Sequence, residues 1–173
     1  FRRVLFRSGH NFPEVIEFRD RRWATETIHA LQHHAVVMPW THAVDLGPNG
    51  EHLEKHHSFA SLWANGEPII QGPKAGNAPY KFGHPGYAWA WRREVLDATG
   101  GLIETAGLGA GDHHMALAII GRVDDSIPRS MTPGYIAPLH CWQRRVEAAA
   151  QHNLGVVRGT IEHGWHGRKA GRQ

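Results

Sequence analysis

A helical pattern that leads directly into a short apolar segment, within residues 18–40, most constrains what this chain can fold into. Segment 23–34 (WATETIHALQHH) places four residues at helical spacing, which predicts one inward helix face: Trp23, Thr27, Ile28 and Leu31. Segment 35–40 (AVVMPW) follows at once and predicts a buried strand, because it is apolar and β-branched. A helix followed by a buried strand indicates an α/β fold.

The later part of the chain continues this alternation. Segment 86–101 begins as a strand or turn and becomes a helix that ends at a glycine pair. Segment 138–153 predicts a further helix, whose inner face is formed by Leu139, Trp142, Val146 and Ala149. We expect three strands to share one sheet: 35–40, 84–90 and 155–163.

Residues 41–83 differ from this pattern, because Gly, Pro and His interrupt them throughout. They predict little regular structure apart from one short helix around HSFASLWA (57–64). An irregular stretch of this length usually lines a functional site.

Composition limits the function classes. Lys and Arg number 19 against 16 Asp and Glu, and the basic residues gather near the two ends of the chain. This is not the continuous basic, aromatic stripe of a nucleic-acid-binding protein, and a mild excess suits small anions such as nucleotide phosphates better. The single Cys141 agrees with a reducing, cytoplasmic location, and no apolar run approaches membrane-spanning length.

The first nine residues, FRRVLFRSG, have neither an initiating Met nor the layout of a secretory signal. They resemble a translated adaptor sequence. We therefore expect residues 1–9 to be a non-native leader, and residues 10–173 to be one partial domain whose N-terminal part is missing.

Asp112 follows a glycine-rich segment, GGLIETAGLGAG (100–111), and precedes the apolar helix pattern HHMALAIIGRV. It stands where a helix N-cap would, and a capping Asp contributes about 1 kcal/mol without any other role. A cap needs at most one of these glycines, however. A carboxylate on a glycine-lined turn, with space beside it for a substrate hydroxyl, suits a general base. Both interpretations are open at this point.

Two further segments carry candidate site residues. His163 and His166, in TIEHGWHG (160–167), stand between glycines at a strand end, where neutral imidazoles often bind metal ions. Tyr87, Trp89 and Trp91 alternate within and just after FGHPGYAWA (82–90). We expect at least one of these rings in the core and one stacked on a sugar, with either tryptophan in either role.

Residues 82–115 together resemble the acceptor-binding and catalytic segment of GT-A glycosyltransferases. The nearest pattern is that of the β-1,4-galactosyltransferases and related C-terminal galactosyltransferase domains, and the resemblance covers about residues 16–169. It implies the C-terminal, acceptor and catalytic part of a nucleotide-diphospho-sugar transferase, with a mixed sheet and flanking helices.

The resemblance also implies roles for individual residues. Asp112 matches the aspartate that deprotonates the acceptor hydroxyl, while Gly111, His113 and Leu108 replace a Glu, an acid and a sugar-contacting Trp. The implied substrate-binding residues are His84, Gly86, Tyr87, Trp89, Gly109, Gly111 and His113. His163 matches a ligand of Mn²⁺ or Mg²⁺, with His166 in reserve.

One departure affects activity. The family's Asp-x-Asp motif, which binds the metal and the donor diphosphate, would fall at positions 13–15, and these are Pro13, Glu14 and Val15. We therefore expect the part that binds the nucleotide-sugar donor to be incomplete, and the fragment to be inactive as a transferase.

The favoured function is inverting, metal-dependent hexosyl transfer from a nucleotide-sugar to a carbohydrate or glycoconjugate acceptor, without a nucleic-acid partner or a transmembrane segment. One alternative is a zinc hydrolase in which His113, His114 and His163 hold the metal and Asp112 activates water. Another is a non-catalytic carbohydrate-binding module that uses the aromatic segment.

Overall fold

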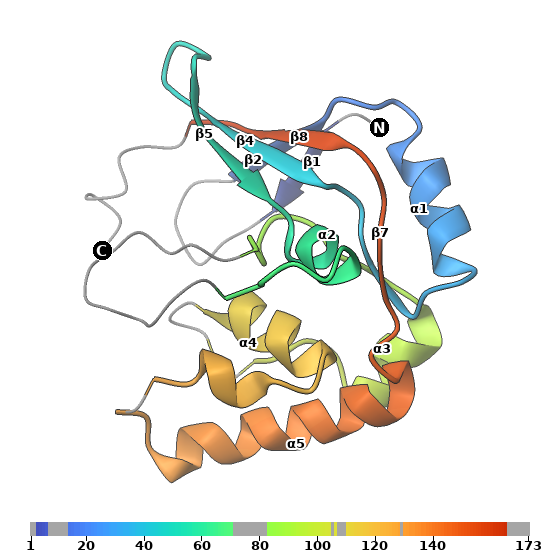
Figure 1. The fold of residues 1–173 in the computed structure, drawn as a ribbon, viewed down its shortest axis with the longest axis vertical. Helices are drawn as coiled ribbons and strands as arrows, with labels where there is room; N and C mark the ends of the chain where they lie inside the picture. Colours follow the sequence, from blue (N-terminus) through green and yellow to red (C-terminus); the bar gives the residue numbers. More distant parts are fainter. Residues whose placement is uncertain are drawn as a thin grey trace.

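The computed structural model describes residues 3–6, 14–70, 83–104, 106, 110–128 and 130–165. These residues form a mixed α/β structure with two mixed sheets and flanking helices (Figure 1). The expected α/β class is confirmed at this level.

The larger sheet has five strands, in the order β1 (Arg3–Phe6), β2 (Glu14–Phe18), β8 (Thr160–His163), β4 (His42–Leu46) and β5 (His52–His57). Strands β4 and β8 run parallel, and the other neighbours run antiparallel. Strand β2 shows the two-residue period of a sheet with one covered face, because Ile16 and Phe18 are buried while Glu17 is exposed. Phe18 also stacks on Trp23 of the following helix.

The smaller sheet has three strands, in the order β6 (Ala90–Trp91), β3 (Val36–Met38) and β7 (Leu154–Val156). Strand β3 is completely buried, which confirms the strand predicted from its apolar sequence. The predicted strand 35–40 pairs with β6 in this sheet, but of the predicted strand 84–90 only Ala90 belongs to β6, so that prediction is wrong for residues 84–89.

The expectation of one strand over 155–163 is wrong, because its two halves belong to different sheets. The chain from β7 to β8 stays parallel to the chain from β3 to β4 throughout: Val157 donates to Met38, and Gly159 accepts from Thr41. Between β3 and β4 lies Pro39, which has no N–H to contribute to a ladder. The sequence pattern of 155–163 alone does not reveal this interruption.

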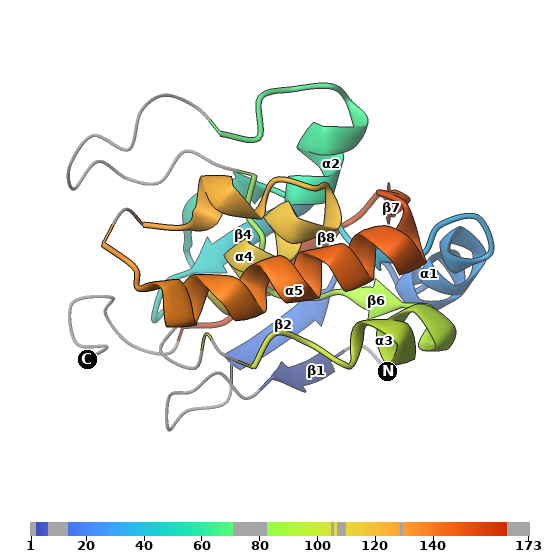
Figure 2. The ribbon, with the colours of Figure 1, turned by 90° about the horizontal axis from the view of Figure 1, so that it is seen from below.

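The helices are α1 (Trp23–Leu31), α2 (Phe59–Ala64), α3 (Arg93–Thr99), α4 (Gly111–Ile119) and α5 (Pro133–Ala150), with a 3₁₀ turn at Val123–Ser126. Helix α4 packs against the long helix α5 (Figure 2). Helix α5 buries a stripe at helical spacing: Leu139, Trp142, Val146 and Ala150. The last of these replaces the expected Ala149, which is partly buried.

Helix α1 presents a different face from the expected one. Thr27 is buried and donates its hydroxyl to the carbonyl of Trp23, whereas Ile28 is 62% exposed. Phe18 of β2 stacks on Trp23, so the helix face that carries Trp23 packs against the sheet. Ile28 therefore faces solvent.

The expectation of little regular structure in 41–83 is wrong for its first part. Residues 42–57 form the β4–β5 hairpin, closed by the turn in which Gly47 donates to the carbonyl of Glu51. Strand β5 is almost entirely exposed, so it lacks the apolar alternation that usually marks a strand. The predicted short helix is confirmed as α2, where the Ser58 hydroxyl accepts the N–H of Ser61 at 3.0 Å.

Candidate active site

Asp45, near the end of β4 in the larger sheet, lies at the centre of a polar cluster. Its Oδ1 accepts a hydrogen bond from the Tyr87 hydroxyl at 2.7 Å and one from His163 Nδ1 at 2.9 Å. Its Oδ2 lies 3.2 Å from Nε2 of His56. The pairing of β4 with β8 places Asp45 beside His163, and the pairing with β5 places it opposite Glu54.

This environment keeps Asp45 ionised. Burial alone would raise the pKa of the Asp45 carboxyl, because it disfavours the charged form. Hydrogen bonds from His163, His56 and Tyr87 outweigh burial and hold the pKa of Asp45 well below its ordinary range. A negatively charged carboxylate therefore lies among these three aromatic side chains at neutral pH.

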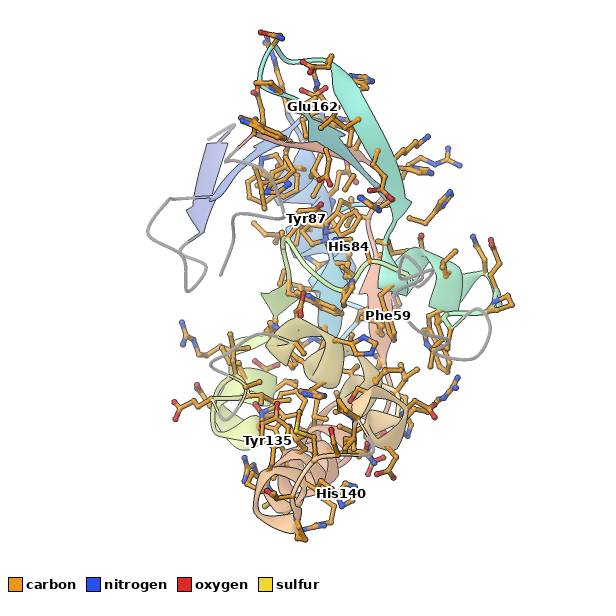
Figure 3. The ribbon with its side chains drawn as sticks, turned by 90° about the vertical axis from the view of Figure 1, so that its left-hand side faces the viewer. Phe59, His84, Tyr87, Tyr135, His140 and Glu162 are labelled. Carbon is orange, nitrogen blue, oxygen red and sulfur yellow. The ribbon has the colours of Figure 1, made fainter. Side chains whose placement is uncertain are left out.

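Tyr87 and His84 form the next layer of the cluster. Their rings stack with centroids 4.3 Å apart and planes inclined by 4°, and both lie between the larger sheet and the helices (Figure 3). The buried Trp40 ring meets Tyr87 edge-on at 5.5 Å and supports it from the core. Tyr87 has a φ of 73°, a left-handed conformation that is rare for a bulky residue and often accompanies a functional role.

Gly86 brings this layer against Asp112. A β-carbon built at Gly86 would lie 2.9 Å from Cε1 of His84 and 3.0 Å from Oδ2 of Asp112, so a larger residue does not fit without displacing them. The N–H of Gly86 also donates to His84 Nδ1 at 3.1 Å. Since this bond requires a lone pair on Nδ1, the hydrogen of His84 is on Nε2.

Asp112 is not the N-cap of α4, contrary to one of the two interpretations of the sequence. The helix begins at Gly111 after Ala110, which has a left-handed φ of 64°, so Asp112 is the second helical residue. The earlier start follows from the bond that His114 N–H donates to the Ala110 carbonyl. The Asp112 side chain is exposed, and its Oδ1 accepts the N–H of His113 at 2.8 Å.

His163, the candidate metal ligand, lies at the end of β8. It is 8% exposed, and its ring centroid is 4.9 Å from that of Tyr87. Because the Asp45 carboxylate only accepts hydrogen bonds, Nδ1 of His163 carries the hydrogen, and the neutral ring has its lone pair on Nε2. Residue Ile16 of β2 lies opposite His163, so positions 14 and 15 belong to the same end of the sheet.

The structure describes some of the other predicted site residues and not the rest. Trp89 and Trp91 are both partly buried against the core: Trp89 donates to the Pro85 carbonyl at 2.7 Å, and Trp91 meets Trp142 edge-on. His113 is 4% exposed, within α4. A β-carbon built at Gly111 would lie 3.4 Å from that of Ala106, which is an ordinary contact. Gly109, Leu108 and His166 lie outside the described residues.

His114 has a structural environment. It is buried, with Nδ1 2.6 Å from the Ser126 hydroxyl and Nε2 3.0 Å from the Tyr135 hydroxyl. The Ser126 hydroxyl donates to the Val123 carbonyl, so His114 Nδ1 donates to Ser126 and Nε2 accepts from Tyr135. With both ring nitrogens bonded in this way, His114 has no lone pair to offer a metal ion.

A group of side chains with metal-ligand chemistry lies on the hairpin side of Asp45. Within the described ranges, Asp45, Glu54 and His56 place one potential ligand atom each within 4.8 Å of one another. Sequence analysis missed all three. The signal that could have found them is the antiparallel pairing of HAVDL with HLEKHH, which brings Asp45 opposite Glu54 and next to His56.

No protein-family model, curated protein or solved structure matches this chain. None of the helices in the described part of the chain is both long enough and apolar enough to cross a membrane. The functional assignment therefore depends on the sequence and the geometry of the site.

Proposed function

We propose that this chain is the acceptor and catalytic part of an inverting, GT-A-type glycosyltransferase, which transfers a hexose from a nucleotide-sugar to a carbohydrate hydroxyl. One observation carries the proposal. Residues 84–87 and Asp112 of one segment meet the distant His163 in one cluster, which Asp45 connects. These are the residues to which the resemblance assigns acceptor binding, the base and the metal ligand.

Asp112 is the proposed general base. It is an exposed carboxylate beside the layer formed by Gly86, His84 and Tyr87, so an acceptor sugar on this layer would have a hydroxyl within its reach. Asp112 takes the hydroxyl proton as the hydroxyl oxygen attacks the anomeric carbon. The bond from that carbon to the nucleoside diphosphate breaks on the opposite side, which inverts the configuration.

His163 is the proposed protein ligand of Mn²⁺ or Mg²⁺. Its Nε2 lone pair suits a metal ion, and Asp45 at Nδ1 is the type of partner that commonly orients a metal-binding histidine. The ion, when bound, neutralises charge on the diphosphate leaving group. One imidazole is a small donor set for a hard cation that prefers several oxygens, so the chain with Pro13, Glu14 and Val15 would bind it weakly.

The two alternatives fare differently. The hydrolase requires His114 as a ligand, and the bonds of His114 to Ser126 and Tyr135 speak against that role. The carbohydrate-binding module needs the same aromatic layer as the transferase, and differs in being independent of Asp112, nucleotide and metal.

Saturation-transfer NMR with a panel of mono- and disaccharides tests the acceptor site, with and without Mn²⁺ and a nucleoside diphosphate. We expect a bound sugar to receive saturation from the wild-type chain, and this transfer to disappear in Gly86→Ala, whose methyl group would fill the space beside Asp112. Gly134→Ala is the matched control, because a β-carbon there has nothing within 4 Å. Absence of any sugar signal, or an unchanged signal in folded Gly86→Ala, would contradict the proposed site.

A further inference from the structure

We infer that Asp45 is a positioning residue that fixes the rings on both sides of the proposed site, His163 on the metal side and Tyr87 on the acceptor side. The inference rests on the proposed function, which assigns metal binding to His163 and acceptor binding to Tyr87. No motif in the sequence singles out Asp45, and its role follows from the pairing of strands.

The first step is the shared oxygen. Tyr87 Oη and His163 Nδ1 both donate to Oδ1 of Asp45, at 2.7 and 2.9 Å. Each ring is held at this oxygen, because turning it would break a bond to a charged acceptor, the stronger type of hydrogen bond. The two rings are in contact as well, at 4.9 Å between centroids. Their relative orientation therefore depends on this oxygen.

The second step is what holds Asp45 itself. His56 Nε2 lies 3.2 Å from Oδ2, so the carboxylate is held at both oxygens and does not rotate freely about its last bond. Glu54 is also 3.8 Å from His56 Nε2 on the hairpin. The backbone of Asp45 is paired on both sides, with His163 of β8 and Glu54 of β5.

The third step connects Asp45 to the base. Tyr87, held by Asp45, stacks flat on His84 (Figure 3). A β-carbon built at Gly86 would lie within 3.0 Å of both His84 and Asp112, so these two side chains border the same space. A change at Asp45 would thus be transmitted to the acceptor surface through Tyr87 and His84. It would also change the tautomer of His163, and with it the nitrogen that carries the lone pair.

The test is ¹⁵N NMR of the histidine side chains in the whole chain, at a pH where the rings are neutral. In the wild type we expect His163 to carry its hydrogen on Nδ1. Asp45→Ala should convert His163 to a mixture of tautomers and shift the His84 ring signals. Asp45→Asn, whose amide oxygen can replace Oδ1, should restore the wild-type tautomer. Asp124→Asn is the matched control, since Asp124 forms an Asp–His pair with His140 on the surface.

A wild-type His163 with its hydrogen on Nε2 would overturn the inference, even if Asp45→Ala does not fold. An unchanged His163 tautomer in folded Asp45→Ala would overturn it too. Mn²⁺ titration separates this inference from the proposed function. We expect broadening of the His163 signals to need about 10–100-fold more Mn²⁺ in Asp45→Ala. One outcome is that Mn²⁺ broadens no His163 signal even in the wild type while the tautomer still depends on Asp45. That result would support the positioning role of Asp45 and contradict the proposal that His163 is a metal ligand.

Discussion

Gly86 is the residue at which the backbone comes closest to the proposed base. Glycine here is explained by proximity rather than by a left-handed turn, since Gly86 has no positive φ. The glycine pair 100–101 is different: both residues have positive φ, and Gly100 ends α3. In the described part of the glycine-rich segment before Asp112, Gly100 and Gly101 thus belong to a helix end, and the glycine that makes room beside Asp112 comes from another segment.

We expect Gly86→Ala to lower the free energy of unfolding by about 1–3 kcal/mol, the usual cost of an overpacked methyl group. The added carbon would meet His84 Cε1 and Asp112 Oδ2 within 3.0 Å. Urea denaturation measures the effect, with Gly134→Ala as control. A loss below about 0.5 kcal/mol would mean that the neighbours move aside easily and that the space is not specific.

Candidate site residues that stand close together in the sequence could be selected from it. Candidates that only strand pairing brings together could not. His84, Gly86, Tyr87 and Asp112 could be selected because they stand in one recognisable segment. Asp45 could not, because its importance arises from the register that sets it beside His163, 118 residues away in the chain.

At the scale of elements, the β4–β5 hairpin supplies Asp45 and depends on it. The hydrogen bonds to Asp45 favour its charged form, so their contribution to stability is complete above the ordinary pKa of Asp, about 4, and is lost as the pH falls through the depressed pKa of the folded state. At pH 7 we expect Asp45→Asn to cost about 1.5–3 kcal/mol, the range for hydrogen bonds to charged groups.

That cost should shrink as the pH falls below about 4, because Asp45 is then protonated in the unfolded wild-type chain. Urea denaturation at pH 7 and at several pH values below 4 measures it. Asp124→Asn, at an 80% exposed side chain, should show little effect at any pH. If the loss of unfolding free energy in Asp45→Asn does not change with pH, Asp45 is not an ionised, hydrogen-bonded carboxylate.

Helices α4 and α5 are joined through a buried histidine. Tyr135→Phe removes the hydroxyl that donates to His114 Nε2, and we expect it to cost about 0.5–1.5 kcal/mol without changing the metal content of the protein. Denaturant unfolding and elemental analysis measure the two quantities. A zinc content that falls in this variant would instead connect His114 with a metal site.

The helices and β3 were predictable because their periodicity is local, whereas the hairpin and the split of 155–163 were not. Strand β5 is exposed and charged, so its pattern resembles that of a loop. The change of sheet between Val156 and Thr160 depends on the neighbouring segment around Pro39 and Thr41. That segment is far away in the sequence, so the local pattern of 155–163 does not reveal the change.

At the scale of the whole molecule, the mixed sheets and covering helices agree with the expected α/β class, and the GT-A assignment stays a proposal. It predicts weak metal binding: we expect Mn²⁺ to bind more weakly than micromolar in calorimetry, and no zinc to survive dialysis, because His163 contributes one nitrogen. Tight Mn²⁺ binding would point to ligands beyond His163, namely the Asp45, Glu54 and His56 cluster that adjoins His163 through Asp45. Stoichiometric zinc after dialysis would favour the hydrolase.

The most direct test of the account is the release of nucleoside diphosphate from nucleotide-sugars in the presence of an acceptor sugar, by a form with aspartates at positions 13 and 15 and by its Asp112→Asn derivative. Asn keeps the shape of Asp112 but cannot take a proton. We expect release to fall by about 10²-fold or more, the usual contribution of a positioned base. Because Ala110 rather than Asp112 precedes the helix, thermal unfolding should change little. Equal release by both proteins, or no release with any nucleotide-sugar, would contradict the account.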